Sequence, residues 1–321
     1  MARIAVVLMN LGGPDSLEAV RPFLENLFSD PAIIGLPPLL RLPLARLVAR
    51  RRARVAREIY ARIGGRSPLL ANTEAQAQAL EDELGPGYRC FVAMRYWHPT
   101  SAETAQEVAQ SAPDEIVCLP LYPQFSTTTT ASSLAAWQNA AVRQGLTCPT
   151  YSIRCYPREQ GLIEAIAGLV RPVLEAASAG GRNPRLLLTA HGLPKRVVRA
   201  GDPYPGQVEQ TAAAVIAALG RPGLDWRVCY QSRIGPLEWI GPATDEEIER
   251  AGRDRVPLVV APISFVSEHS ETLVELDLDY RRLAEASGVP GYHRVATVGV
   301  EPGFIHSLAS LVRGAHSGAA G

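Results

Sequence analysis

Acidic side chains recur at short, regular intervals within the segment SFVSEHSETLVELDLDYRRL, residues 264–283. The row consists of Glu268, Glu271, Glu275 and Asp279. Successive members are three or four residues apart, so a helix over 268–286 places them on one face, where like charges destabilise it. The row is either a solvated helix face or a path that holds a divalent cation loosely and passes it on. Carboxylate and imidazole are suitable ligands for such an ion, and the position of the row directly after an apolar strand favours the second interpretation.

Two histidines stand at comparable places in the chain. His269 lies inside the acidic row, directly after the apolar run VVAPISFVS. His191 ends the run LLLTAH, and Gly192 and Pro194 follow it, which stops a strand. A lone histidine is either a structural hydrogen-bonding group or a functional base. Ligands bind beyond the carboxyl ends of parallel strands, so this placement favours function.

Residues 33–57 combine a dense apolar stretch with arginine. The apolar members are Ile33, Ile34, Leu36, Leu39, Leu40, Leu42, Leu44 and Leu47. The arginines are Arg41, Arg46, Arg50, Arg51, Arg52, Arg54 and Arg57, and the next acid is Glu58. One interpretation is an interdomain helix with a charged outer face. The favoured one is an apolar lip rimmed by positive charge, which rests on an anionic membrane surface or admits an apolar, anionic ligand.

Nucleotides and nucleic acids are not indicated. The loop YPQFSTTTTASS lacks the glycines and the lysine of a P-loop, and NLGGPD lacks the G-x-G-x-x-G pattern of a dinucleotide turn. The chain has 32 Lys and Arg against 32 Asp and Glu, so its net charge of zero does not call for a polyanionic partner.

Short apolar runs alternate with helical patterns, which predicts an α/β fold with parallel sheets flanked by helices. We expect strands at 4–9, 89–94, 115–120, 150–154, 185–189, 226–230, 258–262 and 293–298. Helices are expected over 71–84, 207–219 and 268–286, among others. Three motif pairs follow these strands in the same order in both halves of the chain: NLGGP with AHGLP, MRYWHP with QSRIGP, and LPLYPQF with APISFV. The repetition predicts two similar halves, with a ligand cleft between them lined by these loops.

The expected organisation is a first half over 1–148, a second half over 149–300, and a C-terminal helix with a flexible tail over 301–321, the helix packing back on the first half. The cysteines are Cys90, Cys118, Cys148, Cys155 and Cys229. They are scattered, so we interpret them as buried cytosolic thiols and not as a metal set. No apolar run reaches a membrane span of roughly 18 residues, and the first residues read as a strand and not as a signal peptide. A cytoplasmic protein is expected, peripheral at most on the membrane through its lip.

Six motifs, in order, resemble the ferrochelatase family, whose members insert ferrous iron into a porphyrin at the last step of haem synthesis. They are LMNLGGP, YARIGGRSPL, LYPQFSTTTTASS, TAHGLP, YQSRIGPLEWIGP and FVSEHSETLVELD. The resemblance extends from Ile4 to about Val312. It implies two Rossmann-like, chelatase-type halves with the porphyrin between them. It also implies that His191 and Glu271 face each other at the centre of metal insertion, and Glu268, Glu275 and Asp279 are then expected to form an outer relay for iron.

The resemblance further implies a porphyrin-binding wall and roles for the central pair. The wall residues are Leu11, Tyr60, Ile63, Ser67, Arg95, Tyr96, Tyr122, Trp239, Phe265 and His269. Arg95 is expected to pair either with a porphyrin propionate or with an acid of the protein. Neutral imidazole, with an unperturbed pKa near 6.5, suits His191 for accepting a proton at cellular pH, while Glu271 binds or delivers iron. The two roles could also be exchanged or shared, and the order in which the two residues contact iron stays open.

Two departures from the family pattern refine these expectations. Some members carry an iron–sulfur cluster on a cysteine-bearing C-terminal extension, but this chain has no cysteine after Cys229. We therefore expect no cluster, no permanently bound cofactor, and a monomer. Leu11 stands where some members that act on coproporphyrin have a tyrosine, which favours protoporphyrin IX. The alternatives are coproporphyrin, another tetrapyrrole or metal, and a non-catalytic porphyrin or metal carrier.

Overall fold

The computed structural model describes residues 2–179, 181–233, 235 and 237–316. The chain forms two compact units: a first unit, Met1–Cys155 with Leu308–Gly321, and a second unit, Tyr156–Ser307. Helix α11 (Pro302–His316) therefore begins in the second unit and ends in the first. The tail predicted at 317–321 lies outside the described residues.

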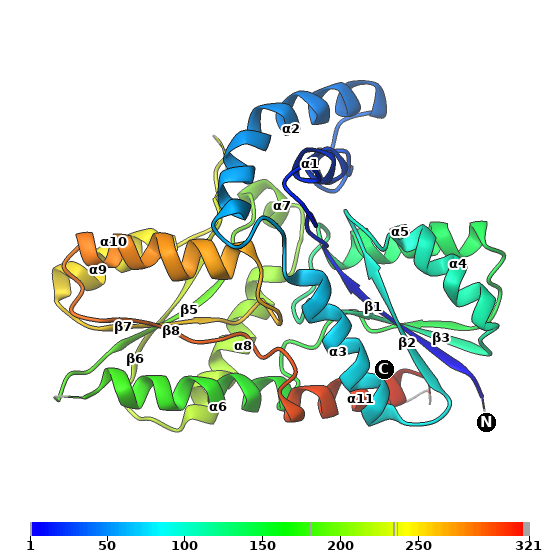
Figure 1. Cartoon of the computed structure of the whole chain (residues 1–321). Helices are drawn as coiled ribbons and strands as arrows, with labels where there is room; N and C mark the ends of the chain where they lie inside the picture. The colour runs from blue at the N-terminus through cyan, green and yellow to red at the C-terminus, as the bar shows by residue number, and fades with distance from the viewer. Residues whose placement is uncertain (1, 180, 234, 236, 317–321) are drawn as a thin grey trace. The chain divides into compact units, whose positions relative to one another are not determined.

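The first unit is built on a parallel four-stranded sheet in the order β2-β1-β3-β4. Its strands are β1 (Ile4–Asn10), β2 (Tyr88–Met94), β3 (Glu115–Pro120) and β4 (Thr150–Ser152). Every residue of β1 is buried, since a central parallel strand has helices over both faces, and this explains its continuous apolar sequence. Figure 1 shows the covering helices on the two faces: α3 (Leu69–Leu84) on one, and α4 (Ser101–Ser111) and α5 (Thr130–Arg143) on the other.

Helices α1 (Val20–Phe28) and α2 (Pro38–Ala61) pack against each other beyond the carboxyl end of β1 (Figure 1). The inner face of α2 is lined by buried alanines at four-residue spacing, which allows the close approach of α1: Ala45, Ala49 and Ala53. Leucines occupy its outer face, and Leu39 and Leu40 are 89% and 61% exposed. The lip predicted from the sequence is thus a helix with a bare apolar face at its start.

The second unit repeats the first, with a parallel sheet in the equivalent order β6-β5-β7-β8. Its strands are β5 (Arg185–His191), β6 (Asp225–Gln231), β7 (Leu258–Pro262) and β8 (Tyr292–Arg294). Figure 1 shows its main helices on the two faces: α6 (Gln160–Ala177) and α8 (Tyr204–Leu219) on one, α9 (Thr244–Asp254) and α10 (Tyr280–Ala286) on the other. The short helix α7 (Lys195–Arg199) follows β5. The α/β fold with two similar halves is confirmed.

Two sequence expectations need correction. The helix expected from residue 268 begins at Glu271, and its first part is a π-helix, η1 (Glu271–Asp279), which continues into α10. The proline that corresponds to Pro99 is Pro242, because the carbonyl of each accepts a hydrogen bond from a β-strand amide, Met94 N and Tyr230 N respectively. The pairing of MRYWHP with QSRIGP aligns Pro99 with Pro236, which lies outside the described residues.

Candidate functional site

The second unit gathers its polar side chains at the carboxyl edge of its sheet. His191 is the last residue of β5 and lies beside Gln231, the last residue of β6, as its Cα partner. The chain leaving β7, which is the other neighbour of β5, leads through Phe265 and His269 to the first residue of η1, Glu271. Residues about 80 positions apart in sequence therefore meet because parallel strands end at the same edge.

One carboxylate lies between two imidazoles. Oε1 of Glu271 is 3.5 Å from Nε2 of His191, and Oε2 of Glu271 is 3.6 Å from Nε2 of His269. Nδ1 of His191 lies 2.6 Å from the carbonyl oxygen of Gly192. Because a carbonyl only accepts, Nδ1 carries a proton, and Nε2 is the nitrogen turned to Glu271. The prediction that His191 and Glu271 face each other agrees with this geometry.

The pair is an ion pair at neutral pH. Burial alone would lower the pKa of His191, but the charge of Glu271 and hydrogen bonds to Glu271 and the Gly192 carbonyl raise it to about 9. Burial would raise the pKa of Glu271, but the nearby charges of His191 and His269 hold it well below its usual range. The sequence argument assumed an ordinary, neutral imidazole at His191. Its raised pKa favours the protonated imidazolium instead.

Three buried polar atoms around this pair have no hydrogen-bond partner among the described residues: Glu271 Oε2, His269 Nδ1 and Gln231 Oε1. Buried polar atoms are nearly always paired in native proteins, so such a concentration indicates a place where a ligand or water binds. The described residues contain no group of three or more His, Cys, Asp or Glu side chains arranged to hold a metal ion.

The predicted acidic row divides in the structure. Glu275 lies one turn after Glu271 and is bound by Ser232 N and Tyr280 OH, both at 2.9 Å from its Oε1. Burial and the neighbouring charge of Glu271 raise the pKa of Glu275. Asp279, at the end of η1, is exposed.

Glu268 does not continue the row. Its Oε1 accepts hydrogen bonds from Arg294 Nη1 at 2.5 Å and from Thr297 N at 3.0 Å. Arg294 also pairs with Asp277 at 2.7 Å. The Glu268 carboxylate is thus neutralised within the protein, on a segment that precedes the helix, and the structure separates it from the relay in which the sequence placed it.

Aromatic rings border the pair within the second unit. The Phe265 and His269 rings have centroids 4.5 Å apart and are tilted by 54°. The Trp239 ring lies against Gly192, where a Cβ atom would come within 3.3 Å of Trp239 Cε3 and 3.0 Å of the Gln231 carbonyl oxygen. Glycine at 192 therefore allows the close packing of Trp239 beside His191. Three of the predicted wall residues are brought to the site in this way.

The other predicted wall residues belong to the first unit. Leu11, Tyr60, Ile63 and Tyr96 meet in one apolar cluster with α1 and α2. Ser67 lies beside Gly13, because a Cβ atom added to Gly13 would come within 2.5 Å of the Ser67 side chain. The hydroxyl of Tyr122 is buried and lies 3.3 Å from that of Ser133. That these residues bind a porphyrin together with those of the second unit stays a prediction.

Arg95 forms the structural ion pair that the sequence left as one of two alternatives. Its Nη2 lies 2.7 Å from Oδ2 of Asp30, and its Nε donates to Ser132 Oγ at 2.7 Å. The same Asp30 oxygen accepts from Tyr96 OH at 2.8 Å, and only 2% of the Asp30 side chain is exposed. Sequence reasoning missed Asp30, because an aspartate before a proline is typical of an exposed turn.

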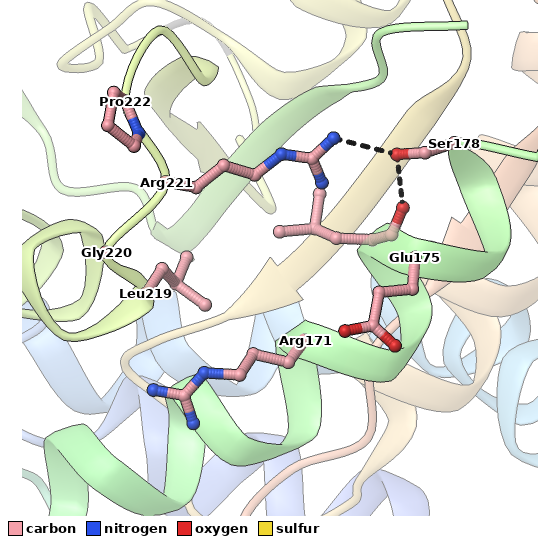
Figure 2. Close-up of a pocket in the computed structure, with 8 residues that line it drawn as sticks. Arg171, Glu175, Ser178, Leu219, Gly220, Arg221 and Pro222 are labelled. Carbon is pink, nitrogen blue, oxygen red and sulfur yellow. Dashed lines mark hydrogen bonds between the residues drawn. The ribbon is translucent and has the colours of Figure 1, made fainter. Parts of the chain in front are cut away.

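The cavity shown in Figure 2 lies elsewhere in the second unit, between the ends of α6 and α8, and measures about 520 Å³. It is lined by Arg171, Leu174, Glu175, Ser178, Leu219, Gly220, Arg221 and Pro222. Its arginines bind helix ends: Arg171 donates to the Ala218 carbonyl at 2.6 Å and Arg221 to Ser178 Oγ at 3.1 Å. None of the predicted site residues lines it.

A duplicated parallel-sheet unit with an imidazole–carboxylate pair beyond the strand ends defines a chelatase-type α/β protein. SirB from Bacillus subtilis, solved with Fe³⁺, has this fold, with a TM-score of 0.53 and 12% identity over 98% of this chain and 95% of its own. CbiX, the terminal enzyme for sirohaem biosynthesis in denitrifying bacteria, gives a TM-score of 0.53 and 16% identity over 98% and 99%.

The chain belongs to the ferrochelatase family, whose model matches residues 3–316. The ferrochelatases of Caulobacter vibrioides and Phenylobacterium zucineum are each 56% identical to it, over 97% and 99% of this chain and 90% and 93% of their own. That of a Wolbachia strain from Drosophila simulans is 49% identical over 96% of this chain and 98% of its own. The chain is therefore a chelatase enzyme, and its family supports porphyrin metallation in haem synthesis. None of the helices in the described part of the chain has the length and apolar character needed to cross a membrane.

Proposed function

We propose that this enzyme inserts Fe²⁺ into protoporphyrin IX, forming protohaem and releasing the two protons of the pyrrole nitrogens. The observation that carries the proposal is the meeting of His191 and Glu271 at 3.5 Å, beyond the strand ends of a chain that belongs to the ferrochelatase family. Iron is the substrate here, and we propose that the enzyme works without an iron–sulfur cluster.

Glu271 is the proposed first ligand of the incoming iron. Its Oε2 is buried without a hydrogen-bond partner among the described residues, and its lowered pKa favours the anionic carboxylate at neutral pH. A carboxylate and an imidazole are ligands that a divalent first-row ion accepts and exchanges. His269 Nε2 lies 3.6 Å from the same oxygen and borders the place where the ion would bind.

Iron binding would prepare His191 for its role as proton acceptor. The resting imidazolium owes its raised pKa to the charge of Glu271. A divalent cation at Glu271 neutralises the negative charge of the carboxylate and places a positive charge beside the imidazolium. Both effects favour the neutral imidazole. His191 then loses its proton to solvent, accepts the two pyrrole protons one after the other through Nε2, and releases each to solvent. About a third of its side chain is exposed, which leaves a route for that release.

The preference for protoporphyrin IX rests on apolar surroundings. Leu11 offers no ligating atom and packs in the apolar cluster of α1 and α2. Protoporphyrin carries two vinyl groups where coproporphyrin carries two further propionates, so an apolar environment disfavours coproporphyrin. The bare leucines at the start of α2, followed by arginines, support contact with an anionic membrane surface, from which an apolar porphyrin can be taken up.

The test is an absorbance assay of the purified protein with Fe²⁺ and either porphyrin under anaerobic conditions. We expect conversion of protoporphyrin at a higher kcat/KM than coproporphyrin. The reverse preference would overturn the assignment of substrate, and binding of porphyrin and metal without spectral conversion would indicate a carrier. The variant His191→Ala should bind porphyrin but lose nearly all turnover, and retained turnover would refute its role as proton acceptor.

A further inference from the structure

The end of β6 connects His191 with Glu271, the two members of the catalytic pair. His191 and Gln231 are Cα partners at the ends of adjacent strands, and Gly192 N donates to the Gln231 carbonyl at 2.9 Å. The Gln231 side chain is fully buried, and its Nε2 donates to the Glu271 carbonyl oxygen at 3.2 Å. One side chain thus links the strand position beside His191 to the first turn of the helix that carries Glu271.

The same junction also fixes Glu275. Gln231 Nε2 lies 3.2 Å from Glu275 Oε2, and the next residue, Ser232, donates to Glu275 through both its amide and its hydroxyl. With Tyr280 OH, four donors hold one carboxylate. Ser232 has a φ of +63°, in the left-handed region that non-glycine residues seldom adopt. Such conformations concentrate at functional sites, where surrounding contacts maintain them.

The amide of Gln231 has a feature that packing does not explain. Its Oε1 is buried and has no hydrogen-bond partner among the described residues, which costs stability as long as no ligand or water binds there. An apolar side chain of the same volume would fill this space without that cost. The donor at Nε2 is therefore the feature that this position supplies, and both its acceptors belong to η1 at the site of Glu271.

We propose that Gln231 is a positioning residue for metal insertion. By holding the Glu271 backbone to the strand beside His191, it maintains the separation at which one metal ion contacts both side chains, and together with Ser232 it fixes Glu275 as a neighbouring negative charge. Glu275 is then a stationary charge and not a mobile carrier of iron. This inference deepens the proposed function and rests on it.

The test uses Gln231→Met, which keeps the volume of the side chain and removes its donor. Loss of a group that orients a metal ligand commonly weakens metal affinity by about 10–100-fold. We expect the affinity for Co²⁺ alone, measured by calorimetry without porphyrin, to fall by about that factor and the KM for Fe²⁺ to rise. The KM for porphyrin should stay at the wild-type value. The melting temperature should also stay unchanged, because the substitution removes the unpaired buried oxygen of Gln231 together with its hydrogen-bond donor. The matched control is Gln76→Met, at a buried glutamine of α3 in the first unit, which should leave Co²⁺ affinity unchanged.

The outcomes separate the two proposals. If the wild-type enzyme metallates porphyrin and Gln231→Met matches it in Co²⁺ affinity and in KM for Fe²⁺, the positioning role is overturned. If the wild-type protein metallates no porphyrin, the proposed function itself fails. Should Gln231→Met not fold, Ser232→Gly provides the test, because glycine adopts a positive φ readily and keeps the amide donor to Glu275. It should raise the KM for Fe²⁺ and not that for porphyrin, and an unchanged KM for Fe²⁺ would contradict the proposal.

Discussion

Replacing Glu271 by glutamine removes the charge that maintains the imidazolium of His191 and keeps the shape of the side chain. The pKa of His191 is raised to about 9 although burial acts to lower it, so the raising effect comes mainly from this carboxylate. Solvent reaches 36% of the His191 side chain and 33% of that of Glu271, which screens their attraction. We therefore expect the pKa of His191 to fall by at least about one unit in Glu271→Gln.

The change should appear in an NMR titration of the His191 ring and in the pH dependence of unfolding by urea. A raised pKa in the folded state means that His191 contributes stability below its unfolded pKa and loses that contribution as the pH rises toward 9. The lowered pKa of Glu271 gives a contribution that is present above its unfolded pKa and is lost in acid. The stability difference between wild type and variant should thus be largest between about pH 4.5 and 6.5 and shrink on either side.

The control is Glu249→Gln, which removes an exposed acid from α9 of the same unit and should leave the His191 titration unchanged. A His191 pKa that is the same in wild type and Glu271→Gln would refute the electrostatic account of the site. So would a stability difference that grows above pH 9.

Three further outcomes are expected. Arg95→Met should destabilise the protein by about 3 kcal/mol in urea unfolding, because it leaves the buried carboxylate of Asp30 without its counter-ion; a raised KM for porphyrin with unchanged stability would instead support the propionate interpretation. Replacing Arg50, Arg51, Arg52 and Arg54 by glutamine should weaken binding to vesicles containing anionic lipid, while equal binding would show α2 to be an ordinary solvated helix. Thr100→Ala should cost about 1 kcal/mol of stability, because Thr100 and Glu103 form a capping box at the start of α4; no loss in urea unfolding would contradict that account.

The strands and the correspondence of the two halves were accessible from the sequence because both depend on local patterns. The buried central strands are apolar runs that could be recognised by themselves, whereas β4 (Thr150–Ser152) and β8 (Tyr292–Arg294) are shorter than the strands expected at 150–154 and 293–298. The motif pairs also showed which strands correspond between the two units. The strand orders of the two sheets are equivalent, which agrees with this correspondence. Since parallel strands end at one edge, the sequence also indicated that His191 and Glu271 both lie near that edge. That they face each other was implied by the resemblance to the ferrochelatase family.

The tertiary structure decided which partner each charged side chain has. Arg294 reaches Glu268 from 26 positions away and Arg95 reaches Asp30 from 65 positions away, and no local pattern distinguishes these acids from their exposed neighbours. The charge state of His191 was likewise beyond the sequence, because it depends on the distance to Glu271 and on burial. Residue types and spacing determined which chemical groups the site contains. Long-range contacts determined which of these groups are paired within the protein and which can take part in the reaction. The physical reason is that ion pairing and pKa depend on separation in space and not along the chain.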